Sequence, residues 1–125
     1  MRSLVAAATL VLVLSGSAGA VPFVRRRPPV PIDAATFAQL VEATKAEAFP
    51  DGKLAQIRNV AAGRRYLFTG PQIVTLLELF TFWYDRVEAL RLTSPSDAQN
   101  AAAVLRYFEP APGLARSEAR RILGL

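Results

Sequence analysis

Two residue types are missing from this 125-residue chain, which has no cysteine and no histidine. The chain can therefore form no disulfide, and it has neither a Ser–His or Cys–His nucleophile pair nor an imidazole general base. Ordinary zinc sites, whose ligands are cysteine and histidine, are excluded for the same reason. Catalysis would have to rely on carboxylates, lysines, hydroxyls or tyrosines.

Lysine is scarce as well: the chain has two lysines, Lys45 and Lys53, and thirteen arginines. Both lie on polar faces of predicted helices, whereas a catalytic lysine has to be removed from solvent. Asp85 and Glu88, one helical turn apart, are the closest approach to a paired-carboxylate site and could share a proton or bind calcium. Alternatively, Asp85 complements the positive end of its helix and Glu88 pairs with Arg91. We favour this second interpretation and expect no catalytic residue, no cofactor and no metal site.

The N-terminal residues have the order of a secretory signal. Met1 and Arg2 give a short positive start, the apolar run Leu4–Leu14 has eleven residues, and small residues occupy positions 15–20. Eleven residues are too few to cross a bilayer, which takes about 20. We therefore predict a signal peptide over residues 1–20 that is cleaved after Ala20. The mature chain is then exported to the periplasm or the exterior, with no transmembrane span.

Proline and arginine dominate the segment that follows. Residues 21–33 contain four prolines and the cluster Arg25-Arg26-Arg27. Because proline fixes φ and removes a backbone donor, we predict an extended linker over this range. The three arginines form a candidate binding site for an anionic surface of the cell envelope. Alternatively, they only keep the linker solvated.

From residue 34 onward the pattern is helical. Apolar residues recur at three- and four-residue steps between turns that contain glycine or proline, and no segment alternates long enough to suggest a sheet. Thr69 and Gln72 are spaced as a capping box at the start of one helix. The predicted fold class is all-α, with about six short helices arranged as three stacked helical hairpins, either repeat-like or an orthogonal bundle. This helical repeat domain spans residues 34–125.

An internal repeat supports the hairpin arrangement. A shift of 33 residues places Thr36 on Thr69, Phe49 on Phe82 and Ile57 on Leu90. A further shift of 28 residues places Asp97 on Thr69 and Phe108 on Phe80. Because a hairpin of two amphipathic helices cannot bury its apolar faces alone, three such units are expected to stack.

The densest aromatic run is Phe80-Thr81-Phe82-Trp83-Tyr84. Consecutive helical positions diverge by about 100°, so Phe82, Trp83 and Tyr84 cannot all face one core stripe. An exposed Trp83 or Tyr84 beside Arg86 would form a recognition site of the kind enriched in protein interfaces. The structural alternative, packing between hairpins, is the one we favour.

Four short motifs carry a resemblance to a known family: Thr69-x-x-Gln72-Ile73, Phe80-Thr81-Phe82, Asp85-Arg86-Val87 and Asp97-x-x-Asn100. Together they make the chain resemble the family of domains of unknown function called DUF4476, over about Thr36 to Leu123. The resemblance implies a short, exported, helical domain. It implies no known activity, so no catalytic residue is carried over. The third unit departs from the family pattern at Pro110 and Pro112.

The function expected from the sequence is that of an exported, non-catalytic module that binds another macromolecule. Its candidate residues are Trp83, Tyr84 and Arg86, and its partner is an unidentified protein. The alternative is an electrostatic binder of an anionic envelope surface through Arg25–Arg27. Nucleic acid is not an expected partner, because the chain is predicted to be exported and has no basic and aromatic platform. A carboxylate-based enzyme would require a cleft that converges on Asp85 and Glu88.

Overall fold

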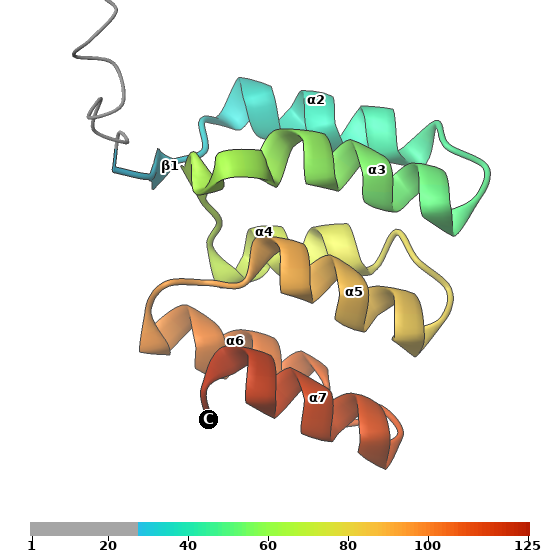
Figure 1. The fold of residues 1–125 in the computed structure, drawn as a ribbon, viewed down its shortest axis with the longest axis vertical. Helices are drawn as coiled ribbons and strands as arrows, with labels where there is room; N and C mark the ends of the chain where they lie inside the picture. The colour runs from blue at the N-terminus through green and yellow to red at the C-terminus, as the bar shows by residue number, and fades with distance from the viewer. Residues whose placement is uncertain (1–27) are drawn as a thin grey trace, which may run out of the picture.

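Six α-helices and one pair of two-residue strands make up the structure, a computed structural model that describes residues 28–125 (Figure 1). In chain order the elements are β1 (Val30–Pro31), α2 (Ala34–Lys45), α3 (Pro50–Ala61), the 3₁₀ turn η4 (Ala62–Arg64), β2 (Tyr66–Leu67), α4 (Gly70–Leu77), α5 (Trp83–Thr93), α6 (Ala98–Tyr107) and α7 (Gly113–Leu123). The predicted all-α fold class is confirmed. The predicted signal peptide and Arg25–Arg27 lie outside the described residues.

The helices pack as three hairpins, α2 with α3, α4 with α5 and α6 with α7. The hairpins stack because α3 packs on α5, α5 on α7, and α4 on α6. The short loops 46–49, 78–82 and 108–112 all lie at one end of the stack, on the right of Figure 1, which we call the turn end. The two strands and the connections 62–69 and 94–97 lie at the opposite end, which we call the strand end.

At the strand end, the first helix of every hairpin begins with a side-chain cap. The Asp33 carboxylate accepts from the Thr36 backbone N–H at 2.9 Å, and Asp97 accepts from the Asn100 N–H at 2.8 Å. Thr69 accepts from the Gln72 N–H at 3.3 Å while the Gln72 side chain accepts from the Thr69 N–H at 2.9 Å, which confirms the predicted capping box.

The repeat alignment placed one of these caps incorrectly. Thr36, aligned with the cap residue Thr69, lies three residues inside the cap Asp33. The reason is helix length, since α2 has 12 residues and α4 has 8. The second helices do keep the 33-residue offset, because Phe49 and Phe82 both occupy the N-cap position.

The strands were not expected, because a two-residue strand is too short to display an alternating pattern. They pair in parallel, with Val30 opposite Tyr66, and the Ile32 N–H donates to the Leu67 carbonyl at 3.1 Å. Ile32 is buried and Asp33 caps α2. The linker predicted to extend to residue 33 therefore ends earlier, and residues 30–33 are part of the fold.

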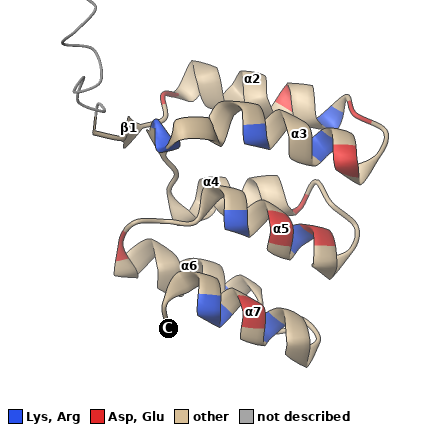
Figure 2. Cartoon of the chain, in the orientation of Figure 1, with Lys and Arg blue, Asp and Glu red and all other residues tan. Residues whose placement is uncertain are grey.

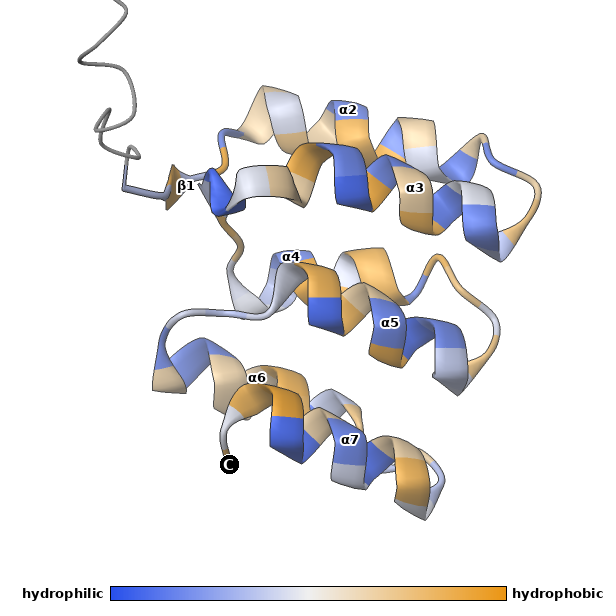
Figure 3. Ribbon diagram, viewed as in Figure 1, coloured by the Kyte–Doolittle hydropathy of each residue, from blue (hydrophilic) through white to orange (hydrophobic). Residues whose placement is uncertain are grey.

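The buried apolar residues form one hydrophobic cluster to which all three hairpins contribute, and hydrophobic positions recur along the helices of each hairpin (Figure 3). Its largest fully buried apolar side chains are Ile57, Ile73, Leu76, Leu77, Leu90, Val104 and Phe108. They come from α3, α4, α5 and α6, with Phe108 directly after α6. The core thus fixes the second and third hairpins against each other and holds α5 in place.

Candidate binding surface

Trp83, the first residue of α5, joins the second hairpin to the third. Its ring centroid lies 5.6 Å from that of Tyr107 and 5.4 Å from that of Phe108, in tilted arrangements. Tyr107 and Phe108 meet edge to face at 5.7 Å. Trp83 is half-buried in this cluster. Its placement matches the packing between hairpins that the sequence favoured over a solvent-facing ring.

Arg86 lies one turn after Trp83 and stacks on the same cluster. Its Cζ is 4.5 Å from the Trp83 ring centroid and 5.9 Å from that of Tyr107, within the range of cation–π attraction. Its Nε also donates to the Phe80 carbonyl at 3.0 Å. Burial raises the pKa of the Tyr107 phenol, and the nearby Arg86 charge opposes that shift. Arg86 therefore holds the aromatic cluster together from within the stack.

Tyr84, by contrast, points to solvent with 74 % of its surface exposed. Phe49 is 74 %, Phe82 65 % and Leu114 87 % exposed, and all four residues lie at the turn end. We call this set the apolar turn edge. Leu114 lies at the second position of α7 and faces outward. The predicted repeat aligns Phe49 with Phe82, and both side chains are exposed.

A groove of about 430 Å³ runs between α5 and α7 next to this edge. Tyr84 and Leu114 line it, and Val87 is its most buried lining residue. Trp83, Pro112 and Ala115 complete the apolar part. Among the predicted recognition residues within 28–125, Tyr84 is thus the one that is mainly exposed to solvent and also lines the groove.

A chain of ion pairs forms the polar side of the groove. Arg91 contacts Glu88 at 2.7 Å and Glu118 at 2.6 Å, and Glu118 also contacts Arg121 at 2.9 Å. The predicted Glu88–Arg91 pair is therefore present. Because these charges are mutually compensated, the groove offers an apolar surface with a neutral rim.

The paired-carboxylate arrangement does not assemble around this groove. Glu88 lines the groove but is occupied by Arg91, and Asp85 does not belong to the lining. Among residues 28–125, no cluster of three or more acidic, cysteine or histidine residues is placed to hold a metal ion.

Acidic and basic residues alternate over the folded part, as Figure 2 shows along α5 and α7. Residues 28–125 contain eleven basic and ten acidic residues, because Arg2 and Arg25–Arg27 precede them and account for the other four of the fifteen basic residues. Four of the five net positive charges of the chain therefore lie in its first 27 residues.

None of the helices within residues 28–125 combines the length and the apolar character that a membrane crossing requires. Neither the curated proteins nor the solved structures contain a match to this chain. A family profile does match, over residues 31–123, and its description is Domain of unknown function (DUF4476). That range covers most of the chain and includes all six helices from α2 to α7. The chain belongs to this family.

Proposed function

We propose that this protein is an exported, non-catalytic module that binds apolar side chains of a polypeptide partner at the apolar turn edge. The observation that carries the proposal is the exposure of Phe49, Phe82, Tyr84 and Leu114 at one end of the stack. Tyr84 and Leu114 also line the groove between α5 and α7. Exposed apolar side chains gathered beside a groove are typical of interaction sites.

The capping pattern supports this proposal. Phe49 and Phe82 occupy N-cap positions and make no side-chain cap bond there. A serine, threonine or aspartate at such a position is more favourable by about 1 kcal/mol, and the exposed phenylalanine rings gain little from burial. These residues therefore do little for the stability of the isolated domain. A role in recognition accounts for their presence.

The chemistry of the groove indicates the class of partner. Its lining is mainly apolar and aromatic, and its charged side chains are already paired with one another. Such a surface suits an aliphatic or aromatic side chain from a polypeptide, since tyrosine and other aromatic residues are enriched in protein interfaces. It does not suit a nucleic acid, whose binding requires many uncompensated basic side chains.

Export and the absence of catalysis are part of the same proposal. Export is supported by the positive start, apolar run and small residues of positions 1–20. Intact-mass measurement of the protein from its native host tests it, with an expected N-terminus at Val21. A mass that still includes Met1–Ala20 would contradict cleavage. The non-catalytic assignment is supported by the lack of histidine and cysteine and by the pairing of Glu88 with Arg91.

Quantitative affinity capture from the native envelope fraction tests the binding site. The mature parent chain is compared with the Tyr84→Ser/Leu114→Ser double variant, and Leu125→Ser serves as the matched control. Leu125 is also exposed, at 48 %, but it lies at the strand end. A partner recovered with the parent and the control should be lost with the double variant. A partner retained by the double variant would place the binding site elsewhere.

The charge distribution favours a second candidate function, binding to an anionic envelope surface through Arg25–Arg27. Each basic residue near an anionic membrane contributes about 1 kcal/mol, so three contribute about a hundredfold in partitioning at low salt. Vesicle sedimentation across a salt series tests it, with all three arginines changed to serine in one variant. Binding that survives in this variant would assign the membrane contact to the folded domain. Lack of binding by the parent at low salt would rule out this function.

A further inference from the structure

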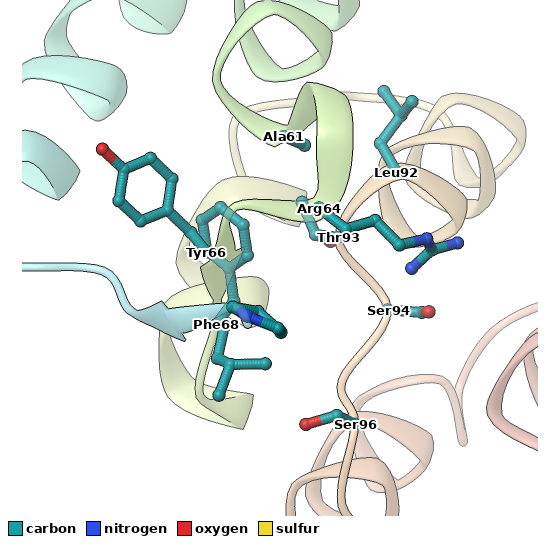
Figure 4. Close-up of a pocket in the computed structure, with 10 residues that line it drawn as sticks. Ala61, Arg64, Tyr66, Phe68, Leu92, Thr93, Ser94 and Ser96 are labelled. Carbon is teal, nitrogen blue, oxygen red and sulfur yellow. The ribbon is translucent and has the colours of Figure 1, made fainter. Parts of the chain in front are cut away.

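A second cavity lies at the strand end, away from the apolar turn edge. It has a volume of about 140 Å³ and lies between the η4–β2 segment and the connection from α5 to α6 (Figure 4). Its apolar wall includes Ala61, Tyr66, Phe68 and Leu92. Pockets for drug-sized ligands take about 300–1,000 Å³, so this one has room for a single small group.

The polar side chains of the lining are those of Arg64, Thr93, Ser94 and Ser96, and the Thr93 hydroxyl donates to the Ala89 carbonyl at 2.9 Å. Arg64 is its one charged lining residue, and Ser94 and Ser96 also line it, with the Ser94 hydroxyl on the side of the Arg64 guanidinium in Figure 4. Within residues 28–125, neither Arg64 nor these two serine side chains make a hydrogen bond or an ion pair. Arg91 and Arg116, in contrast, use their guanidinium groups within the fold.

The backbone at Arg64 directs its side chain toward this cavity. Gly63 has a φ of 73° and Arg64 a φ of 52°, both in the left-handed region. Glycine adopts that region freely, whereas a side chain with a Cβ atom does so at a cost. Among residues 28–125, Arg64 is the one residue other than glycine with a positive φ. The resulting turn carries the Arg64 side chain over the α5–α6 connection, above Ser94 (Figure 4).

We propose that this cavity binds an oxyanion group, a carboxylate or a phosphate, through the Arg64 guanidinium. The planar fork of arginine matches the two oxygens of either group, and the Ser94 hydroxyl, on the same side as the guanidinium in Figure 4, supplies a further donor. The lining contains no acidic residue that would repel the anion. Ala61, Tyr66, Phe68 and Leu92 can contact the first carbon atoms attached to it. This site is independent of the apolar turn edge.

An oxyanion fits better than the alternatives that the surroundings offer. Pro29 lines the cavity, and the arginines at positions 25–27 come shortly before it in the sequence. These arginines are poor candidates to occupy the cavity, because the positive charge of Arg64 would repel them. A metal ion would find no carboxylate, cysteine or histidine ligand in the lining. A purely apolar ligand would make no use of the Arg64 guanidinium, which is exposed to solvent.

Titration of the ¹⁵N-labelled mature chain with inorganic phosphate and, separately, with butyrate tests the proposal. Saturable amide shifts are expected at Arg64 and at residues 94–96. Tighter binding of phosphate would identify a phosphate site, and tighter binding of butyrate would identify a site for a carboxylate on a carbon chain. No saturable shift at these amides with either probe would overturn the proposal.

Two glutamine variants provide the matched comparison. Arg64→Gln should weaken binding about tenfold or more, because a charge-assisted arginine contact is lost. Arg106→Gln removes the same charge from an exposed position on α6 and should leave binding unchanged. Arg64→Gly supplies a second test, because glycine tolerates the left-handed backbone and the variant should keep the parent's melting temperature while losing the anion. Equal weakening in Arg64→Gln and Arg106→Gln would show that the anion responds only to overall charge and would overturn the site.

Discussion

The strand end and the turn end of the stack begin their helices in opposite ways. At the strand end, α2, α4 and α6 start from Asp33, Thr69 and Asp97, and each side chain accepts a backbone N–H. At the turn end, α3, α5 and α7 start from Phe49, Phe82 and Pro112, and none of these makes a side-chain cap bond.

The difference separates stability from recognition. Caps at the strand end satisfy backbone donors that would otherwise lack partners inside the protein. The turn end leaves its helix starts to solvent and displays apolar side chains beside a groove. Substitutions at the two ends should therefore change different properties, and the predictions that follow test this division.

The largest effect is expected for Trp83→Ala, at the turn end but inside the aromatic cluster. Removing this ring takes away its contacts with Tyr107 and Phe108 and should lower the free energy of unfolding by about 3 kcal/mol. Tyr84→Ala, at the exposed neighbouring position, should change the free energy of unfolding by less than about 0.5 kcal/mol. Urea denaturation measures both variants. A similar loss in both would show that the exposed edge also stabilises the fold.

At the strand end, Thr69→Ala removes one half of the capping box in α4. The expected loss is about 1 kcal/mol, which lowers the melting temperature of a domain of this size by about 4–8 °C. Thermal melting followed by circular dichroism measures it. Thr75→Ala on the same helix is the control, because the Thr75 hydroxyl donates to a carbonyl within α4 and takes no part in the cap. Unchanged melting of Thr69→Ala would contradict the importance of the strand-end caps.

The opposite change is expected when the turn end receives a cap. Phe49→Ser places a good N-cap side chain before α3, where the backbone already has the extended conformation that a cap requires. The free energy of unfolding should rise by about 0.5–1 kcal/mol. Affinity for the partner should fall at the same time if Phe49 contributes to binding. A lower melting temperature for this variant would show that the ring makes contacts that stabilise the domain.

The sequence predicted the strand-end caps better than the turn-end surface. Thr69 and Gln72 are recognisable because a capping box has fixed spacing and fixed residue types. Asp33 was read as part of a linker, since the prolines before it conceal a strand of two residues. The exposure of Leu114 could not be predicted from periodicity, because the first turn of a helix is covered only if another element passes over it. The contact between the Trp83 and Tyr107 rings could not be predicted from the sequence either, because it depends on how two hairpins stack.

The smallest expected effect is a dependence on pH that only the strand-end caps provide. Hydrogen bonds from Thr36 lower the pKa of Asp33, and those from Asn100 lower the pKa of Asp97, below the ordinary value of 3.8. A lowered pKa in the folded state means that the caps stabilise the fold above about pH 4 and lose that contribution as the pH falls through the folded-state pKa values. Both carboxylates are fully exposed, so the effect on the melting temperature should be small.

Asp33→Asn/Asp97→Asn keeps a good capping side chain at each position but removes its titration. Melting the parent and this variant at pH 6 and pH 3 should show a smaller loss in the variant. Equal losses would mean that these two caps are not the source of the acid sensitivity.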